Sequence, residues 1–375
     1  MSQLQNSRGV HTARVALLYQ AIEPPTINGV RKPPKPGGYQ DGCADIAFNL
    51  SSQPGIDIVT PIGSPDPREH VGWSFPDSED GILAAIHKGA THLFANTVVF
   101  ANHPLQTSAR VGEYQDKVKV VGHPPCMVEL HDDKHYVNDM LRKSGKFTLP
   151  RGWLLEDNGT DLDTQLRSLD VHFPVVGKPV RGRGSHGVRV CQDLAELRTH
   201  VQALFKESPA IILEEYLAGQ EATVTVLPPS DDYPSYRALP IVTRFNHTNG
   251  VVPYNGIVAV TANSRAITAE EYTKDSTYSA IATECEDVAK TLGVTALIRI
   301  DVRRFTEEPG SQFALFDVNP KPNMTGPGRP GRDDQASLSA IAAAEMGWDY
   351  PRLLSEMLNS AQPLRRLRAM RPDNA

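Results

Sequence analysis

A lysine and a glycine-rich loop stand side by side in residues 173–188. Residues 175–178 read as a short apolar strand ending in Lys178; a loop with three glycines and two arginines follows, then a return strand at 188–190. Loop glycines let the backbone approach a polyanion, and a lysine meets that anion as a point charge. The stretch predicts a lid over phosphates. The alternative is an ordinary hairpin with a flexible tip, because the loop is neither a Walker loop nor a dinucleotide-binding turn.

A second group of polar residues lies in the last third of the chain. Arg299 and Asp301 are two residues apart, and so are Asp317 and Asn319. Residues two apart on a strand face the same side, so pairing of the two strands would bring all four side chains to one face. Carboxylate and amide oxygens suit Mg²⁺, which commonly adds substrate phosphates to a carboxylate or two. The alternative is an amphipathic sheet whose polar face is simply wet.

The hydrophobic pattern predicts the elements that position these groups. Strands and helices alternate over the first 125 residues, which indicates an open α/β domain. The expected elements there are strands at 14–19, 55–60, 91–96 and 118–122, and helices at 41–50 and between Ser78 and Gly89.

The remainder of the chain reads as α+β, with turn signals between strands that can form a mainly antiparallel sheet. Before residue 228 we expect a helix at 136–144, the hairpin around Lys178, a helix from Asp193 to about 205, and strands from 210 and at 222–227. Beyond it we expect strands at 239–245, 256–261, 295–305 and 312–318, a helix at 276–292, a basic Pro-Gly loop at 319–334 and a closing helix at 336–346.

The loop from Gln20 to Tyr39 carries five prolines together with Arg31, Lys32 and Lys35. Long loops inside compact domains are more often functional than idle. One interpretation is a rim that meets an anionic group of a substrate. The alternative is a stiff, exposed connection.

Composition bounds the class of protein. The chain has 375 residues, 40% apolar and 22% charged, with a net charge of −6, which argues against nonspecific nucleic-acid binding. Four widely spaced cysteines indicate reduced thiols in a cytoplasmic protein. We expect neither a secretory signal nor a membrane span, because the N-terminus is polar and no apolar run approaches the roughly 20 residues that a span needs.

These residues, in this order, resemble the ATP-grasp superfamily and, within it, the D-alanine–D-alanine ligase-like branch. The resemblance covers roughly residues 126–355 and rests on residues 133–134, 173–188, 213–221, 299–302 and 317–325. It implies an ATP-grasp fold of class α/β (α+β) with three domains. These would be an N-terminal pre-grasp α/β domain (1–125), a central α+β lid subdomain (126–227) and a C-terminal α+β subdomain with the metal site (228–375).

The resemblance also implies the cofactors ATP and Mg²⁺, with Mn²⁺ as a substitute, and a role for each matching residue. The implied catalytic residues are Arg299 and Lys178, and the implied metal ligands are Asp301, Asp317 and Asn319. The implied nucleotide-binding residues are Lys134, Lys178, Gly182, Gly184, Ser185, Gly187, Glu214, Glu215, Tyr216, Leu217 and Glu221. Ser337 lies in a segment that would help to shape the acceptor pocket.

The activity that the resemblance implies is ATP-dependent joining of small amino acids through an acyl phosphate, with release of ADP and phosphate. The alternatives are a nucleotide-binding regulator of the same fold without turnover and a phosphotransferase of the same fold. The expected partners are small-molecule amino acids, with no nucleic acid and no membrane. A homodimer is the assembly often found in this branch.

Several positions depart from the branch's pattern. Asp317 stands where a glutamate is usual, so we expect metal binding with altered geometry. Gly184 replaces the first of a pair of serines, and His186 follows Ser185; His186 is either a proton acceptor or a surface residue. Tyr254 could close over the site.

The loop at 325–334 is longer and more basic than in the branch. Arginine grips carboxylates in a bidentate fashion, so Arg329 or Arg332 is predicted to bind a substrate carboxylate. The alternative is a solvated Gly-Pro loop.

Overall fold

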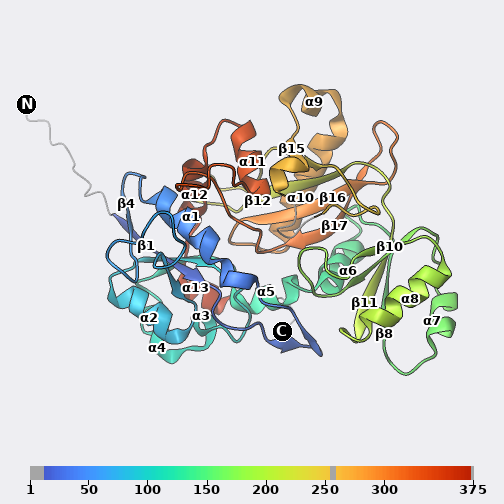
Figure 1. Cartoon of the computed structure of the whole chain (residues 1–375), viewed down its shortest axis with the longest axis horizontal. Coiled ribbons are helices and arrows are strands. Elements are labelled where there is room, and N and C mark those ends of the chain that lie inside the picture. The colour runs from blue at the N-terminus through green and yellow to red at the C-terminus, as the bar shows by residue number, and fades with distance from the viewer. Residues whose placement is uncertain (1–11, 254–258, 373–375) are drawn as a thin grey trace, which may run out of the picture.

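A computed structural model describes residues 12–253 and 259–372. Their strands form a six-stranded, a four-stranded and a second six-stranded sheet, together with a two-stranded hairpin. In Figure 1 the first sheet and its helices lie at the left, the four-stranded sheet lies at the lower right, and the last sheet lies above and between them. This mixed architecture confirms the predicted fold class. Within the described ranges, no helix is long and apolar enough to cross a membrane.

The first sheet is parallel except at one edge. Its order is β18-β7-β6-β1-β4, with β5 also pairing with β1, and only β18 runs antiparallel to its neighbour. The apolar run of β1 is buried in the middle of the sheet, as expected for a parallel strand covered on both faces. The strands are β1 (Ala13–Tyr19), β4 (Ile56–Ile58), β5 (Ser74–Pro76), β6 (His92–Asn96), β7 (Lys119–Val121) and β18 (Gln362–Pro363).

Helix α2 begins and ends at capping residues that are visible in the sequence. The Ser78 hydroxyl accepts the Gly81 N–H (3.3 Å) at the start of α2, and Gly89 follows its end with φ +90°. The helices are α1 (Gln40–Leu50), α2 (Glu79–His87), α3 (Pro104–Thr107), α4 (Ala109–Gly112) and α13 (Leu364–Ala369). The loop from Gln20 contains the hairpin β2 (Thr26–Ile27) and β3 (Val30–Arg31), and the 3₁₀ turn η1 (Pro36–Tyr39).

The four-stranded sheet is antiparallel, in the order β10-β9-β11-β8. It includes the predicted hairpin of Lys178 and is covered by two helices through an apolar cluster that contains Leu166, Leu197 and Val201. Asp193 caps the second helix by accepting the Glu196 N–H at 2.9 Å. The elements are β8 (Gly152–Glu156), α7 (Leu162–Ser168), β9 (Val175–Pro179), β10 (Arg189–Cys191), α8 (Leu194–Leu204) and β11 (Ala210–Glu215). Two further helices, α5 (Pro125–His131) and α6 (Lys134–Ser144), precede this sheet.

The last sheet is antiparallel, as predicted, in the order β15-β14-β12-β16-β17, with β13 pairing with β12. Alternate residues of β12 and β16, such as Val224 and Ile300, pack in one core with Ile281 and Cys285 of α10. The elements are β12 (Glu221–Leu227), β13 (Arg237–Ala238), β14 (Val242–Arg244), η2 (Val260–Ala262), β15 (Ser264–Ala266), α9 (Ala269–Lys274), α10 (Ser276–Thr291), β16 (Ile298–Arg304) and β17 (Phe313–Asn319).

The end of the chain returns to the first sheet. Helices α11 (Leu338–Glu345) and α12 (Tyr350–Asn359) share an apolar cluster with α1 and with Leu227 and Val242 of the last sheet. β18 then pairs with β7, and α13 packs beside α3. The closing helix predicted at 336–346 corresponds to α11; α12, β18 and α13 were not predicted.

Two expectations need correction. β12 pairs with β14 and β16, so the break between the second and third sheets falls before residue 221 and not after 227. The strand predicted at 256–261 is wrong at its described end, because residues 260–262 form the 3₁₀ turn η2; residues 254–258 lie outside the described ranges. The other domain limits stay predictions.

Candidate active site

The predicted polar face is present on the last sheet. β16 and β17 pair so that Asp301 lies opposite Asp317 and Arg299 lies opposite Asn319. Asn319 Nδ2 is 2.9 Å from Asp301 Oδ2 and 3.5 Å from Asp317 Oδ2. The Arg299 guanidinium donates to both Asp301 oxygens, at 3.0 and 3.1 Å. The four side chains therefore form one contiguous cluster.

An irregularity in β17 turns Asp317 toward this cluster. Opposite Asp301 and Val302, β17 contributes Asp317 and Leu315 and leaves Phe316 between them without an opposite residue. On a regular strand, Asp317 would share the core-facing side of Leu315. The extra residue turns the carboxylate out of the core, as β-bulges beside active sites do.

Lys178 reaches the cluster from the neighbouring sheet. Its buried Nζ lies 2.5 Å from Glu214 Oε2 and 2.9 Å from the carbonyl oxygen of Phe316. Asn138, on α6, donates to Glu214 Oε1 (2.9 Å) and to the same carbonyl (3.3 Å). The Phe316 carbonyl at the bulge thus links β17 to β9 and α6 through hydrogen bonds. Asn138 was not predicted from the sequence.

Lys134 enters from the start of α6. Asp133 caps that helix by accepting the Tyr136 N–H (3.0 Å), and the Lys134 N–H donates to the carbonyl of Val180, directly after β9. The Lys134 ammonium forms an ion pair with Asp317 Oδ1 at 2.5 Å. The two lysines selected from the sequence therefore meet the same strand, β17, from different elements.

Neighbouring opposite charges keep Asp317 and Lys134 ionised despite their burial. Burial by itself would raise the pKa of Asp317, but Lys134, Lys178 and Arg299 hold that pKa below its ordinary value. Burial likewise opposes the charge on Lys134, yet Asp317 raises the pKa of that ammonium above its ordinary value. Both groups are charged at neutral pH, which is the state needed to bind a cation and an anion.

The donor set fits Mg²⁺. Asp301 and Asp317 supply hard carboxylate oxygens, the Asn319 amide adjoins both, and Thr223 orients Asp301 by donating to Oδ1 at 2.7 Å. Along the described parts of the chain, no three His, Cys, Asp or Glu side chains gather as a metal site. Phosphate oxygens or water would therefore have to complete the coordination, as is usual for this ion.

The glycine-rich loop follows β9, and Arg181, near its start, is held in place by hydrogen bonds. Arg181 is buried, donating to the carbonyl of Glu129 at 3.0 Å and to Asp133 Oδ2 at 3.2 Å. Gly184 and Gly187 have φ of +57° and +69°, a region that favours glycine.

The other members of the loop are exposed or half-buried. Ser185 adopts φ +57° without being glycine, and Gly182 lies in the loop before the turn at 184–187. His186 Nε2 lies 2.7 Å from Glu207 Oε2, and both side chains are more than half exposed. This contact favours the surface interpretation of His186 over proton transfer.

The residues predicted to bind the adenine base and the ribose surround the end of β11. Glu214 is buried beside Lys178, Leu217 is buried, and Glu215 Oε2 accepts the Arg151 N–H at 3.2 Å. Tyr216 and Glu221 line a groove of about 700 Å³.

In that groove Glu221 has a histidine and an arginine as neighbours. Its Oε2 lies 2.9 Å from His247 Nε2 and 3.7 Å from Arg303 Nη1, and Arg303 also donates to the Tyr216 hydroxyl at 3.1 Å. His247 and Arg303 were not selected from the sequence. The groove lining does not include Lys134, Lys178 or the carboxylates of β16 and β17.

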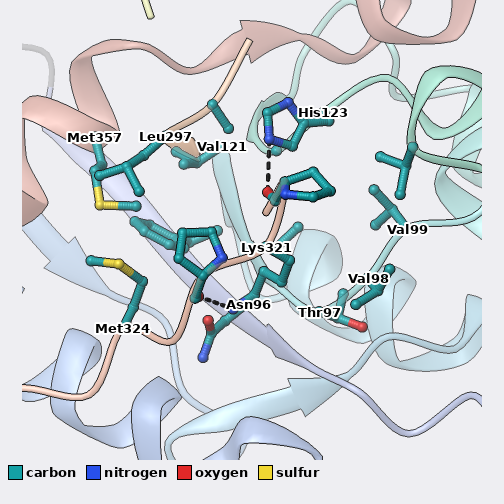
Figure 2. A pocket seen from close by; sticks show the side chains of 17 residues that line it. Asn96, Thr97, Val98, Val99, Val121, His123, Leu297, Lys321, Met324 and Met357 are labelled. Carbon is teal, nitrogen blue, oxygen red and sulfur yellow. Dashed lines mark hydrogen bonds between the residues drawn. The ribbon is translucent and has the colours of Figure 1, made fainter. Parts of the chain in front are cut away.

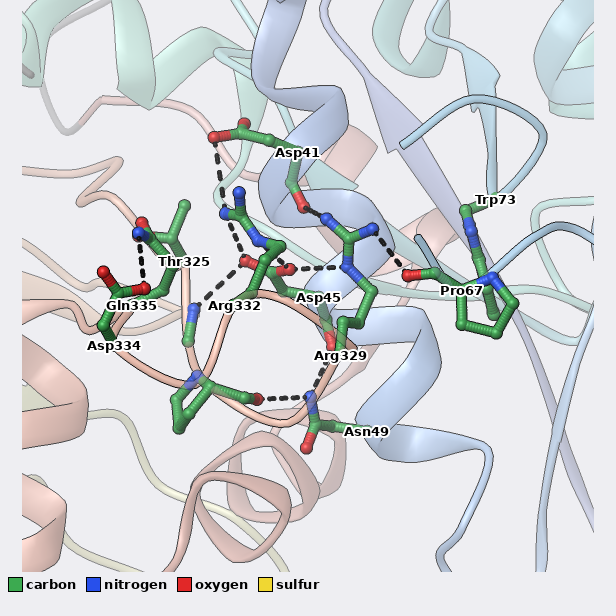
Figure 3. Close-up of polar contacts among 12 residues, drawn as sticks. Asp41, Asp45, Asn49, Pro67, Trp73, Thr325, Arg329, Arg332, Asp334 and Gln335 are labelled. Carbon is green, nitrogen blue, oxygen red and sulfur yellow. Dashed lines mark hydrogen bonds and ion pairs between the residues drawn. The ribbon is translucent and has the colours of Figure 1, made fainter. Parts of the chain in front are cut away.

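The two arginines of the loop at 325–334 serve an internal carboxylate. Figure 3 shows Arg329 and Arg332 converging on Asp45 of α1. Arg329 Nε lies 2.7 Å from Asp45 Oδ1, and Arg332 binds both oxygens at 2.8 Å. Arg329 is 2% exposed and Asp45 is fully buried. These contacts favour a structural role over the predicted binding of a substrate carboxylate.

Ser337 and Tyr254 are the remaining residues that were predicted to lie at the substrate site. Ser337 is buried and caps α11 by accepting the Ala340 N–H at 3.2 Å. Tyr254 lies outside the described residues.

A small pocket of about 40 Å³ lies where the carboxyl ends of β6 and β7 meet the loop after β17. Its walls are mainly apolar, with Asn96, Thr97, His123 and Lys321 as polar members (Figure 2). The His123 ring lies with Nε2 2.9 Å from the carbonyl oxygen of Pro320, which fixes the loop that follows Asn319. Burial, together with nearby Lys35, lowers the pKa of Lys321 to about 7.

An open α/β sheet, a lid sheet with a lysine beside a glycine-rich loop, and an antiparallel sheet with facing aspartates together define an ATP-grasp protein. Solved structures show the same fold over nearly the whole chain. The Bacillus anthracis D-alanine–D-alanine ligase superposes with a TM-score of 0.62 at 18% identity, covering 95% of this chain and 98% of that one. The Enterococcus faecalis VanG D-Ala:D-Ser ligase superposes at 0.61 with 14% identity, covering 93% and 99%.

The family follows from the sequence. The model of the D-Ala–D-Ala ligase C-terminus matches residues 155–359, more than half of the chain, which therefore belongs to this family. The D-alanine–D-alanine ligase of Aquifex aeolicus is 30% identical over 185 residues (49% of this chain, 55% of the relative). The enzyme of Gloeobacter violaceus is 26% identical over 197 residues (50% and 55%). The chain spans about half the length of the curated relatives that it matches.

Proposed function

We propose that the protein is an ATP-dependent carboxylate–amine ligase that joins small amino acids through an acyl phosphate and releases ADP and phosphate. The observation that carries the proposal is that Lys134 pairs with Asp317 and Lys178 binds the carbonyl of the adjacent Phe316, beside the cluster of Asp301, Asp317 and Asn319. Family membership supports it, because the named relatives are D-alanine–D-alanine ligases.

The first step brings two anions together, because a substrate carboxylate attacks the γ-phosphate of ATP. Lys134 and Lys178 offset their repulsion, each exchanging part of its present carboxylate contact for phosphate oxygens. Asp301, Asp317 and Asn319 would hold Mg²⁺, which would supply Lewis-acid charge at the phosphates.

The second step is attack of an amine on the acyl carbon, with phosphate leaving. Arg299 is preorganised for it, since its two contacts with Asp301 fix the guanidinium at the edge of the metal ligands. It stabilises the negative charge that develops on the tetrahedral oxygen. The loop from Gly182 to Gly187 covers the phosphates and excludes water, because an acyl phosphate hydrolyses easily.

The nucleotide base lies against the end of β11 in this proposal. Glu214 and the backbone of residues 215–217 hold adenine, and Glu221 holds the ribose hydroxyls beside His247. The groove of about 700 Å³ at Tyr216 and Glu221 supports this position. The homodimer and the cytoplasmic location stay predictions.

The test is a screen of amino-acid pairs for Mg²⁺-dependent ADP release, with mass spectrometry of the products. A ligase gives ADP and a new amide in equal amounts. A phosphotransferase gives ADP and a stable phosphorylated product instead. ATP binding without ADP release by any pair would indicate the regulator and contradict the proposal.

A matched pair of variants ties turnover to the site. Arg299→Lys keeps a cation but loses the bidentate contact with Asp301, and it should reduce amide formation more than ATP binding. Arg189→Lys, on an exposed position of β10, is the control that should leave both unchanged.

A further inference from the structure

Three basic side chains gather around one buried tyrosine ring. The Nζ atoms of Lys35 and Lys321 lie 4.6 and 4.3 Å from the ring centroid of Tyr39, and the guanidinium carbon of Arg183 lies 5.6 Å from it. They come from the loop after β1, the loop after β17 and the glycine-rich loop. Three segments far apart in the sequence therefore place like charges together.

The tyrosine is held there by a rigid turn. Gly37, Gly38 and Tyr39 all have positive φ, at 70°, 58° and 67°, although Tyr39 is not glycine. The N–H of Gln20, at the end of β1, donates to the carbonyl of Gly38 (2.8 Å), and a Cβ on Gly38 would lie 2.2 Å from the Gln20 carbonyl oxygen. A bulky residue in the left-handed region, persisting because its surroundings fix it, is typical of functional sites.

The positive charge of the group is incompletely matched. Lys35 Nζ is 3.6 Å from Asp41 Oδ1, and Lys321 Nζ donates to the carbonyl of Pro322 at 3.1 Å. Among the described residues, the buried Nε and Nη2 atoms of Arg183 have no hydrogen-bond acceptor. A buried donor without an acceptor costs free energy, so the arrangement favours an incoming anion.

We propose that Lys35, Arg183 and Lys321 form a subsite for the second carboxylate of an acidic amino-acid substrate. This second group is the side-chain carboxylate, which does not react. The sign of the charge excludes a substrate ammonium group from this position. Two of the three residues lie on segments of the proposed active site, because Lys321 follows Asn319 by two residues and Arg183 belongs to the glycine-rich loop. The proposal rests on the ligase function and narrows its substrate class to acidic amino acids.

The experiment measures binding without turnover. Calorimetric titration of the full chain, with ADP and Mg²⁺ present, compares L- and D-glutamate and L- and D-aspartate with the corresponding glutamine and asparagine. Each pair differs in one charge at nearly constant shape. At least one acidic member should bind tenfold or more tightly than its amide.

Variants locate the effect. Lys321→Met and Lys35→Met should each remove most of the preference for the acidic member while ADP still binds. Lys290→Met, on the exposed face of α10, should leave the preference unchanged.

Equal affinity for acid and amide, or no measurable affinity for any of them, overturns the proposal. So does a loss of ADP affinity in Lys35→Met with the acid preference intact, because the cations would then serve nucleotide phosphates. An acid preference without ADP release by any pair would leave the subsite standing and the ligase function contradicted.

Discussion

At Lys178 a single ammonium group carries several interactions. It pairs with Glu214, donates a hydrogen bond to the carbonyl oxygen of Phe316 and lies 5.8 Å from the centroid of the Phe316 ring. Lys178 and Glu214 are both buried, so each charge depends on the other to offset its loss of hydration. Structural and catalytic roles of Lys178 can therefore be separated only by changing both members of the pair.

Lys178→Met should destabilise the fold by about 3–5 kcal/mol, because Glu214 is left as an unpaired buried charge. Lys178→Met with Glu214→Gln should regain most of that stability, since the uncharged amide needs no counter-ion. Urea unfolding measures the stability of each variant, and ADP release measures the activity. We expect ADP release to be lost in both variants. A stable double variant with full ADP release would contradict the role assigned to Lys178.

Asp317→Asn should raise the Mg²⁺ concentration that gives half-maximal ADP release by about tenfold or more, because a charged metal ligand becomes neutral. Asp317→Glu should retain the metal, since the longer acid supplies the same carboxylate oxygens. The measurement is ADP release against Mg²⁺ concentration, with Asp231→Asn on an exposed loop as the control. An unchanged Mg²⁺ half-saturation in the Asn variant would remove Asp317 from the metal site.

At the scale of elements, the long loop at 325–334 is docked on α1. Asp45 accepts from two arginines, and Asn49, one turn later, donates to the carbonyl of Pro327 at 2.9 Å. This docking holds the segment between the proposed metal ligands of β17 and helix α11. The basic residues that suggested substrate binding are thus used to fix a loop.

Arg329→Met should lower the free energy of unfolding by about 3 kcal/mol or more, because Asp45 is fully buried. Arg332→Met should cost less, since Arg332 is partly exposed and Arg329 still neutralises Asp45. Urea midpoints measure both variants, and adding Asp45→Asn to Arg329→Met should recover much of the loss. A tenfold rise in the amino-acid KM of Arg332→Met at unchanged stability would restore the substrate-binding interpretation.

At the scale of the whole molecule, two buried histidines lie where the first sheet leads into the rest of the chain. Burial lowers the pKa of His123 to about 3 and that of His131 to about 4. In the unfolded chain both protonate near pH 6.5. Between that pH and the folded values the unfolded state binds more protons, so stability falls as the pH is lowered.

From pH 7 to pH 5, each of these histidines should cost about 2 kcal/mol of stability. His123→Gln should therefore show a shallower loss of stability over this range than the unsubstituted chain. Urea unfolding at several pH values checks this, and His172→Gln, whose side chain is 76% exposed, should leave the slope unchanged. Parallel pH profiles for all three proteins would contradict the assignment.

Much of the site was predictable because it depends on local periodicity. Arg299 with Asp301, and Asp317 with Asn319, share a face through the two-residue repeat of strands, and glycine and lysine beside a short apolar run mark the lid hairpin. Caps such as Ser78 and Asp193 are equally local. Side chains that act across sheets, such as Asn138 on Glu214, have no such local signal.

By itself the sequence determined the kinds of elements and the faces on which their polar residues lie, because those follow from spacing along one strand or helix. Only the tertiary structure decided that Asp45 is the partner of Arg329, 284 residues away, that β18 returns to β7, and that three loops bring cations to Tyr39. Such pairings depend on which surfaces bury most apolar area and compensate most charge when the elements pack, and no short stretch of sequence contains that information.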